Sequence, residues 1–300
     1  MELKIKNMNL GIKFIHLVNM LLLGLFAFSC IYPFYFILIN SLSSPASVAN
    51  GVYLFPENFT LNAYDNLKSV PGVGFSIVIS IGRAVIGSLF TTFCSSFCAY
   101  ILTRRHMIAP KFFYRFFIVT MYINAGFISY YLLISALNLR NNFLVYILPY
   151  GVSAYYIILI KTYIESMPTA IWESAEIDGA SIPAIYARII VPLAKPILAC
   201  IVIFAAVFQW NAWSDDLFFM LGSKARYLHC LQFLLYKNLQ TNMAAAMKGA
   251  SASGGGGGLA VTSQTLKMAM TFITVVPILC VYPFMQKYFT KGIMLGAVKG

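Results

Sequence analysis

Acidic side chains are scarce in this chain, and four of the nine gather in or just before one short segment. That segment, residues 172–196, reads WESAEIDGASIPAIYARIIVPLAKP and lies between two strongly apolar stretches. The four carboxylates belong to Glu165, Glu173, Glu176 and Asp178. Carboxylates form charge-assisted hydrogen bonds with lysine and arginine, so an exposed group of them can dock on a basic partner. We expect this segment to remain in water and to contact another protein.

Other residues that could carry out chemistry do not form a constellation. The three histidines, His16, His106 and His229, fall in unrelated segments. Cys94 and Cys98 have helical spacing, but no histidine or further cysteine completes a zinc ligand set. No phosphate-binding sequence G-x-x-x-x-G-K-S/T occurs, and the glycine tract at residues 249–258 is typical of a flexible linker. We therefore expect the chain not to be an enzyme and to bind no metal or cofactor itself.

The elements that position these residues are expected to be membrane-spanning helices. Hydrophobic residues make up 60% of the chain and charged residues only 10%, whereas a soluble domain has about 25% charged residues. Several apolar runs approach the roughly 20 residues that cross the hydrocarbon core. They cover residues 14–39, 75–102, 112–136, 143–164, 196–221 and 268–289. The alternating pattern of a membrane β-barrel is absent, so we predict an all-α membrane protein with six transmembrane helices.

The distribution of positive charge predicts the orientation of these helices. The net charge is +12, and lysine and arginine are most frequent in the two tails and in the loops on the same side as the N-terminus. Such residues are retained on the cytoplasmic side of a membrane. Both termini are therefore expected to be cytoplasmic, and the charge does not indicate a nucleic-acid partner. A cleaved signal peptide over residues 1–45 is disfavoured, because the apolar run extends to Asn40.

These expectations divide the chain into three parts. Residues 1–74 form a tail, the first span and an outer loop with a short helix near residues 61–68. Residues 75–289 form the transmembrane core, which the polar segment at 165–196 interrupts between the fourth and fifth spans. Residues 290–300 form a cytoplasmic tail. Among the six cysteines, only Cys230 is expected to face outward from a loop.

The polar segment predicts a helix, a turn and a second helix. Pro168 suits the first position of a helix over about 168–178, and Ser166 could cap it. Gly179 is a typical helix stop. Ile171, Trp172 and Ala175 share one helix face and are expected to form an exposed apolar knob. A second helix begins near Ser181 and leads into the fifth span.

The pattern E-S-A-x-x-D-G-A-x(9)-I-x-P-L-x-x-P resembles the EAA loop of ABC-importer permeases, in the sugar-importer branch. That loop also lies between the fourth and fifth of six core spans. Two departures are mild: Ser174 replaces an alanine and is equally small, and Val191 replaces a leucine and is equally apolar. FQWNAWSDDLFF (208–219), YINAGFISYYLL (122–133) and the C-terminal QKYFTKGIMLGAVKG resemble further stretches of that group, and the resemblance extends over about residues 75–297.

The resemblance implies a transport subunit of the bacterial plasma membrane without its own motor. Such permeases work with a second permease, a cytoplasmic ATPase pair that hydrolyses Mg-ATP, and an extracellular binding protein for the carbohydrate. The EAA helix sits in a cleft of the ATPase, and the spans tilt with it, so that the central cavity alternately faces the two sides. The residues implied in this coupling are Ile171, Trp172, Glu173, Ala175, Asp178, Gly179 and Ala180.

Substrate contacts are expected from polar and aromatic side chains within the spans. Sugars are held by hydrogen bonds to their hydroxyls and by aromatic faces against their C–H surfaces. Residues of the right type and depth are Tyr122, Asn124, Gln209, Trp210 and Asn211. Hydrogen bonding between helices is the alternative role for each. Arg83 lies deep in a span and is expected to pair with backbone carbonyls of the spans or with the partner permease, or to contact an acidic sugar.

Two other classes of transporter stay open as alternatives. An ABC permease for amino acids or polyamines would share the EAA loop, although the C-terminal sequence argues against it. An ion-driven secondary transporter would carry acidic residues inside the membrane. All nine acidic residues of this chain are expected in loops or at the ends of spans, so this class is less favoured.

Overall fold

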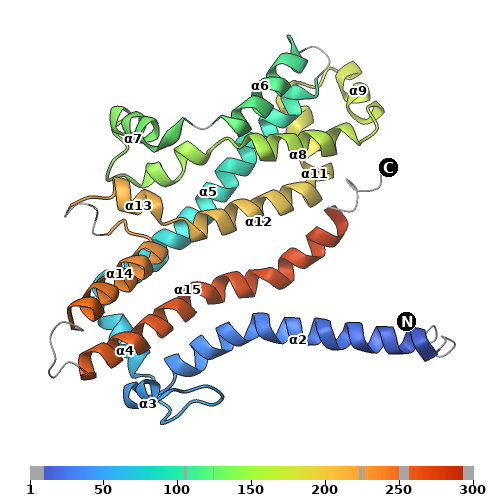
Figure 1. Ribbon diagram of the computed structural model, residues 1–300. Coiled ribbons are helices and arrows are strands. Elements are labelled where there is room, and N and C mark those ends of the chain that lie inside the picture. The colour runs from blue at the N-terminus through green and yellow to red at the C-terminus, as the bar shows by residue number, and fades with distance from the viewer. Residues whose placement is uncertain are drawn as a thin grey trace. The chain divides into compact units, whose positions relative to one another are not determined.

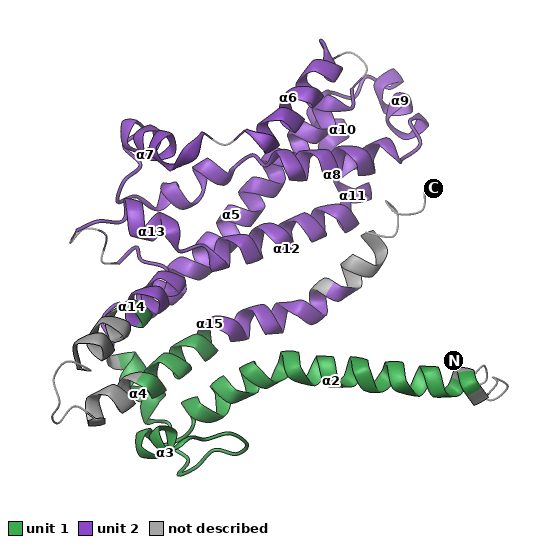
Figure 2. Cartoon of the chain, viewed as in Figure 1, with its two compact units in different colours: residues 1–69, 239–273 green, residues 70–238, 274–300 purple. Residues whose placement is uncertain are grey.

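The computed structural model describes residues 10–104, 107–123, 125–222, 225, 227–249 and 257–292. Over these residues the chain is helical and contains no β-strand. It divides into two compact units (Figure 2). Unit 1 comprises residues 1–69 and 239–273, and unit 2 comprises residues 70–238 and 274–300.

Unit 1 combines a long apolar helix with a compact loop. Its N-terminal helices are α2 (Leu10–Ser41), α3 (Pro45–Asn50) and α4 (Asn62–Ser69), and α4 confirms the short helix predicted near residues 61–68. The loop folds back on the end of α2: the Asn40 side chain donates to the Val52 carbonyl at 3.2 Å, and the Glu57 backbone N–H donates to Ser43 Oγ at 3.1 Å. Polar groups at the end of an apolar helix are thereby satisfied within the chain. Parts of α14 (Leu231–Gly249) and α15 (Gly257–Gly292) complete this unit.

Unit 2 contains the remaining helices and holds the candidate functional sites (Figure 1). In chain order its helices are α5 (Val73–Leu102), α6 (Pro110–Tyr122), α7 (Gly126–Ala136), η1 (Phe143–Tyr146), η2 (Leu148–Tyr150), α8 (Ala154–Glu165), α9 (Ala170–Ile177), α10 (Ile182–Ile185), the π-helix η3 (Tyr186–Ile190), α11 (Val191–Leu193), α12 (Lys195–Asn211) and α13 (Ser214–Phe219).

Helix α5 is the centre of unit 2 and packs mainly against α12 and α8. Its buried face consists largely of small polar residues: Ser76, Ser80, Ser88, Thr91, Thr92, Ser95 and Ser96. Small side chains allow helices to approach closely in a membrane, and their hydroxyls can bond across the interface. Closer to α9, an apolar cluster of residues such as Tyr100, Ile160 and Ile185 joins α5, α8 and α10. This scaffold fixes the positions of the segments that follow.

The described residues contain three helices that are long and apolar enough to cross a membrane. They are Lys13–Ser41, Val73–Leu102 and Gln264–Phe284. The number reaches six if three bent pairs each form one span: Pro110–Tyr122 with Gly126–Ala136, Phe143–Tyr150 with Ala154–Glu165, and Ile182–Leu193 with Lys195–Asn211. The helical fold class is as predicted, and the apolar segments coincide broadly with the six predicted runs.

The end of the fifth predicted span, residues 196–221, was placed too far along the chain. Helix α12 ends at Asn211, and Ala212 has an extended backbone with φ −73° and ψ 126°. The next residues form the separate helix α13, whose Asp215 and Asp216 are buried. Carboxylates at this depth need partners, and the break after α12 allows both to reach them.

Candidate coupling element and substrate pocket

The predicted helix–turn–helix of the polar segment is present. Helix α9 ends at Ile177, and Gly179 has a left-handed φ of +75°. The Ala180 N–H donates to the Ala175 carbonyl at 2.9 Å, and the Gly179 N–H donates to the Glu176 carbonyl at 3.0 Å. This left-handed ending satisfies carbonyls at the end of the helix and favours glycine at position 179. Ser181 precedes α10, as predicted.

The start of α9 differs from the prediction. The helix begins at Ala170 after Thr169, so Pro168 is not its first residue and Ser166 is not its cap. Ser166 instead ends α8 and donates through Oγ to the Tyr163 carbonyl at 2.6 Å. Ser166 does not cap α9 because its hydroxyl is hydrogen-bonded to a carbonyl three residues earlier, in the last turn of α8.

The orientation of α9 corrects the expected apolar knob. Trp172 and Ala175 do share one face, but both pack against the apolar cluster of α5, α8 and α10. Ile171 is 37% exposed, and the most exposed apolar side chain of the segment is Ile177, at 87%. Ile182, just after the turn, is also exposed. The exposed apolar surface of α9 is therefore centred on Ile177, which is not among the residues expected to form the knob.

The carboxylates of this segment divide into paired and outward-facing groups. Glu176 forms an ion pair with Arg104, which follows α5, and the Arg104 guanidinium also lies 5.3 Å from the centre of the Tyr100 ring. Glu165 pairs with Lys161 at 2.6 Å. Asp178 and Ala180 are exposed beside the turn, whereas Glu173 is half-buried. The ion pair of Glu176 joins α9 to the end of α5 within the chain.

Arg83, in the middle of α5, is completely buried and has several partners. It forms an ion pair with Asp215 of α13, and its Nε donates to Gln209 Oε1 at 2.7 Å. Its Nη1 donates to the Ala212 carbonyl at 3.1 Å, and its guanidinium lies 4.4 Å from the Tyr146 ring centre. The predicted pairing with a backbone carbonyl is confirmed. Asp215 and Asp216 follow the end of α12, which agrees with the expectation that acidic residues lie at the ends of spans, but both side chains are buried.

Asp216, the neighbour of Asp215 in α13, contacts the loop before α14. Its Oδ1 accepts hydrogen bonds from the Cys230 backbone N–H at 3.2 Å and lies 3.0 Å from His229 Nδ1. The Cys230 side chain is 1% exposed and therefore buried within the protein, and its location in an outer loop stays a prediction. Burial raises the pKa of its thiol. The hydrogen bond between the Asp216 carboxylate and the Cys230 backbone N–H fixes this part of the loop against α13, where the Cys230 side chain is buried.

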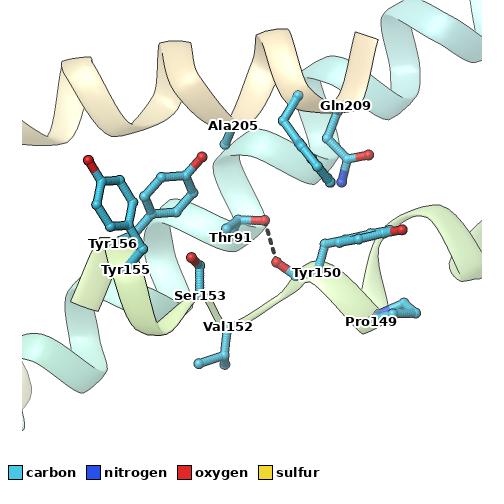
Figure 3. Close-up of a pocket in the computed structure, with 10 residues that line it drawn as sticks. Thr91, Pro149, Tyr150, Val152, Ser153, Tyr155, Tyr156, Ala205 and Gln209 are labelled. Atoms are coloured by element: carbon cyan, nitrogen blue, oxygen red, sulfur yellow. Dashed lines mark hydrogen bonds between the residues drawn. The ribbon is translucent and has the colours of Figure 1, made fainter. Parts of the chain in front are cut away.

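Two adjoining pockets lie in unit 2: the first between α5, η2, α8 and α12, and the second between η2, the end of α12 and the start of α13. Figure 3 shows the lining of the first pocket, with Tyr155 and Tyr156 at one end and Tyr150 and Gln209 at the other. This pocket has a volume of about 280 Å³, and Thr91 on its wall donates to the Tyr150 carbonyl at 2.7 Å. The second pocket, of about 300 Å³, shares Tyr150 and Phe208 with the first. Aromatic faces beside hydroxyl and amide groups suit a sugar ring.

The residues expected to contact substrate are only partly brought together. Gln209 lines the first pocket and Asn211 the second. Trp210 points elsewhere, and its indole N–H donates to the Thr274 carbonyl of α15 at 3.0 Å. Tyr122 is 83% exposed and lines neither pocket. Asn124 lies outside the described residues, as do residues 250–256 of the glycine tract and residues 293–300 of the C-terminal tail.

The tyrosines that form much of the first pocket are not among the residues expected from the sequence to contact substrate. Tyr150, Tyr155 and Tyr156 come from η2 and the start of α8, and Ser153 lies between them. A signal existed in the sequence, because YGVSAYY places three phenols around a short break in an apolar run. The predicted span over residues 143–164 is a continuous helix, and a continuous helix does not indicate that these three phenols line one pocket. The bend of 48° between the two helical parts brings them together.

Comparison with known proteins extends these observations over the whole chain. No family model matches it. The chain is 33% identical over 288 residues to the polygalacturonan/rhamnogalacturonan transport system permease protein YtcP of Bacillus subtilis, covering 95% of this chain and 99% of that protein. It is 32% identical to Protein LplC of the same organism, covering 94% of each. The melibiose/raffinose/stachyose import permease protein MelC of B. subtilis is 26% identical, over 93% of this chain and 95% of the relative.

A solved structure agrees with these relatives. The fold matches a chain of a bacterial ABC transporter involved in the import of the acidic polysaccharide alginate. The TM-score is 0.82 and the identity 28%, and the match covers 94% of this chain and 99% of the other. The chain belongs to the permease subunits of carbohydrate ABC transport systems.

Proposed function

We propose that this chain forms one half of the membrane pathway of a bacterial importer for uronate-containing oligosaccharides. The observation that carries the proposal is the similarity, over 95% of the chain, to a permease named for polygalacturonan and rhamnogalacturonan transport. The structural neighbour, named for the import of acidic alginate, supports the same substrate class. All three named substrates are polysaccharides that contain uronic acids.

The two pockets of unit 2 supply a physical route for such a substrate. Their linings combine the rings of Tyr150, Tyr155 and Phe208 with polar groups such as Ser153 and Asn211. Rings can stack on the C–H faces of a sugar, and the polar groups can bond its hydroxyls. None of the described lining residues is cationic. We infer that the acidity of the substrate is recognised by an extracellular binding protein, while the pockets recognise sugar rings.

Energy would reach this pathway through α9. The exposed Ile177 and Asp178 and the turn at Gly179 form the surface that we propose to seat in a cleft of a cytoplasmic ATPase. Mg-ATP would be hydrolysed there and not on this chain. Because Trp172 and Ala175 pack on the core of unit 2, movement of α9 would be transmitted to α5 and α8 and would change the side that the pathway faces.

The remaining assembly follows the same proposal. Six spans would cross the bacterial plasma membrane with both termini in the cytoplasm. A second, homologous permease would provide the other half of the pathway, giving a heterodimer. The exposed apolar side chains of α2, such as Phe14, Leu25 and Phe28, would face lipid or that partner.

Uptake by the reconstituted assembly tests the proposal. The chain would be co-expressed with its partner permease, ATPase and binding protein, purified as a complex and placed in proteoliposomes containing Mg-ATP. We expect uptake of digalacturonate that requires the binding protein and ATP. Because no described lining residue of the two pockets is cationic, a second candidate is a neutral galactooligosaccharide, for which raffinose is the matched probe. Uptake of raffinose without digalacturonate would overturn the acidic assignment, and uptake without an ATPase would overturn the ABC mechanism.

A further inference from the structure

Two side chains of the first pocket are held by the buried ion pair of Arg83 and Asp215. The Tyr150 hydroxyl donates to Asp215 Oδ1 at 2.9 Å. Gln209 accepts from Arg83 Nε at 2.7 Å and donates through Nε2 to the Tyr146 carbonyl at 2.9 Å. Tyr150 lines both pockets and Gln209 lines the first. The ion pair itself lines neither pocket, so it reaches the pathway only through these two residues.

The face of α5 that carries Arg83 supports the same wall at two further positions. Arg83, Gly87 and Thr91 recur at intervals of four residues, which places them on one helix face. At Gly87 an added Cβ would lie 2.6 Å from Gln209 Nε2, so any larger residue at position 87 would displace the Gln209 amide. Thr91 Oγ1 bonds the backbone carbonyl of Tyr150 at 2.7 Å. One face of α5 therefore fixes both the tyrosine and the glutamine.

Stability alone is a weak explanation for the ion pair. Arg83 and Asp215 have side-chain exposures of 0% and 2%. Removing two charges from water costs much of what their attraction returns, and well-packed apolar residues often replace such a pair without loss of stability. What apolar residues cannot supply is the acceptor for the Tyr150 hydroxyl and the donor for the Gln209 amide. These two bonds fix the direction of polar groups on the pocket wall.

We propose that Arg83 and Asp215 are positioning residues for transport: they act through Tyr150 and Gln209 to hold the pocket wall in the geometry that receives a sugar ring. This inference rests on the proposed function of the pocket. It assigns specificity for the carbohydrate in part to residues that never touch it. Loss of the pair would weaken substrate recognition in the membrane even where folding is preserved.

The test compares variants of the complete reconstituted transporter. Tyr150→Phe removes only the hydroxyl, and the double variant Arg83→Met/Asp215→Leu removes the pair without leaving a single buried charge. Tyr282→Phe, at an exposed tyrosine of α15 outside both pockets, is the matched control. We expect KM for digalacturonate, or for raffinose if that is the transported sugar, to rise about tenfold in the double variant. We expect about fivefold for Tyr150→Phe, with maximal rates and yield of assembled complex close to the wild type.

A second measurement does not depend on the sugar. Ser153→Cys places a thiol on the pocket wall, and peptide mass spectrometry reports its alkylation by N-ethylmaleimide separately from the native cysteines. We expect the alkylation rate to change at least about threefold when Tyr150→Phe or the double variant is added. The control Tyr282→Phe should leave the rate unchanged.

The outcomes separate this inference from the proposed function. Normal KM together with an unchanged alkylation rate in an assembled double variant would overturn the positioning role, because the pair would then be only structural. Altered alkylation in a transporter that carries neither sugar would support the positioning role and contradict the substrate assignment. Should the double variant fail to assemble, Tyr150→Phe alone decides: wild-type KM and alkylation would refute the proposal.

Discussion

Among the described residues of unit 2, one ion pair involves the middle of α5 and another the residue that follows its end, and their surroundings differ. Arg104 and Glu176 join the end of α5 to α9, with side-chain exposures of 10% and 32%. Arg83 and Asp215 join the middle of α5 to α13 and are fully enclosed. A partly exposed pair contributes little to stability because water solvates both groups. A buried pair leaves an unpaired charge in the interior when one member is lost. An arginine–carboxylate pair is therefore expected to be easily replaced at α9 and to be required for folding at α13.

The largest effect is expected from breaking the buried pair on one side only. Asp215→Leu leaves the Arg83 guanidinium without its counter-charge in the core. We expect a loss of about 3–5 kcal/mol in stability, with little assembled complex after detergent extraction. Size-exclusion chromatography and thermal denaturation of the complex measure this. A variant that assembles and melts like the wild type would remove the difference between the two regions.

The exposed and inward faces of α9 should respond differently to the same substitution. Ile177→Asp changes a side chain that is 87% exposed, so we expect the permease to fold and to lose ATPase binding by about tenfold or more. Trp172→Asp places a carboxylate against the apolar cluster of unit 2, and we expect it to reduce folding itself. Co-purification of the ATPase, compared with the yield of folded permease, separates the two results. Equal loss of fold in both variants would contradict the orientation of α9.

A smaller effect is expected at Gly87. The added methyl group of Gly87→Ala would lie 2.6 Å from Gln209 Nε2, so the glutamine must move away from Arg83 or the helices must separate. We expect a cost of about 1–3 kcal/mol in stability and a raised KM for the sugar. Gly74→Ala, on the same helix with no atom within 4 Å of the added carbon, is the control. Matching results for the two alanine variants would show that the space around Gln209 is not restricted.

The smallest effect is expected from the pair at α9. Glu176→Gln keeps the size of the side chain and removes its charge. We expect the complex to lose about 0.2–1 kcal/mol of stability, and we expect this loss to decrease as salt is added. Thermal denaturation at low and high ionic strength provides the measurement. A loss as large as that of Asp215→Leu would place this pair in the same class as the buried one.

Much of the architecture was predictable because it depends on local composition and spacing. Apolar runs identified the helical class, and glycine at position 179 predicted the end of α9, where φ is +75°. Two local predictions failed for identifiable reasons. Ser166 bonds to the helix before it and not to the one after it. Trp172 and Ala175 share a face, as their spacing required, but spacing alone does not tell which side of a helix meets the rest of the protein.

The sequence by itself determined the family, the helical class and the position of the helix–turn–helix at residues 170–185, since each depends on residue types and short intervals. Only the tertiary structure decided the partners of the buried charges. Arg83 and Asp215 are 132 residues apart, and no local pattern joins them. The same holds for the pocket, whose tyrosines converge because the chain bends by 48° before α8. Long-range pairing depends on how helices pack, and packing is a property of the whole fold.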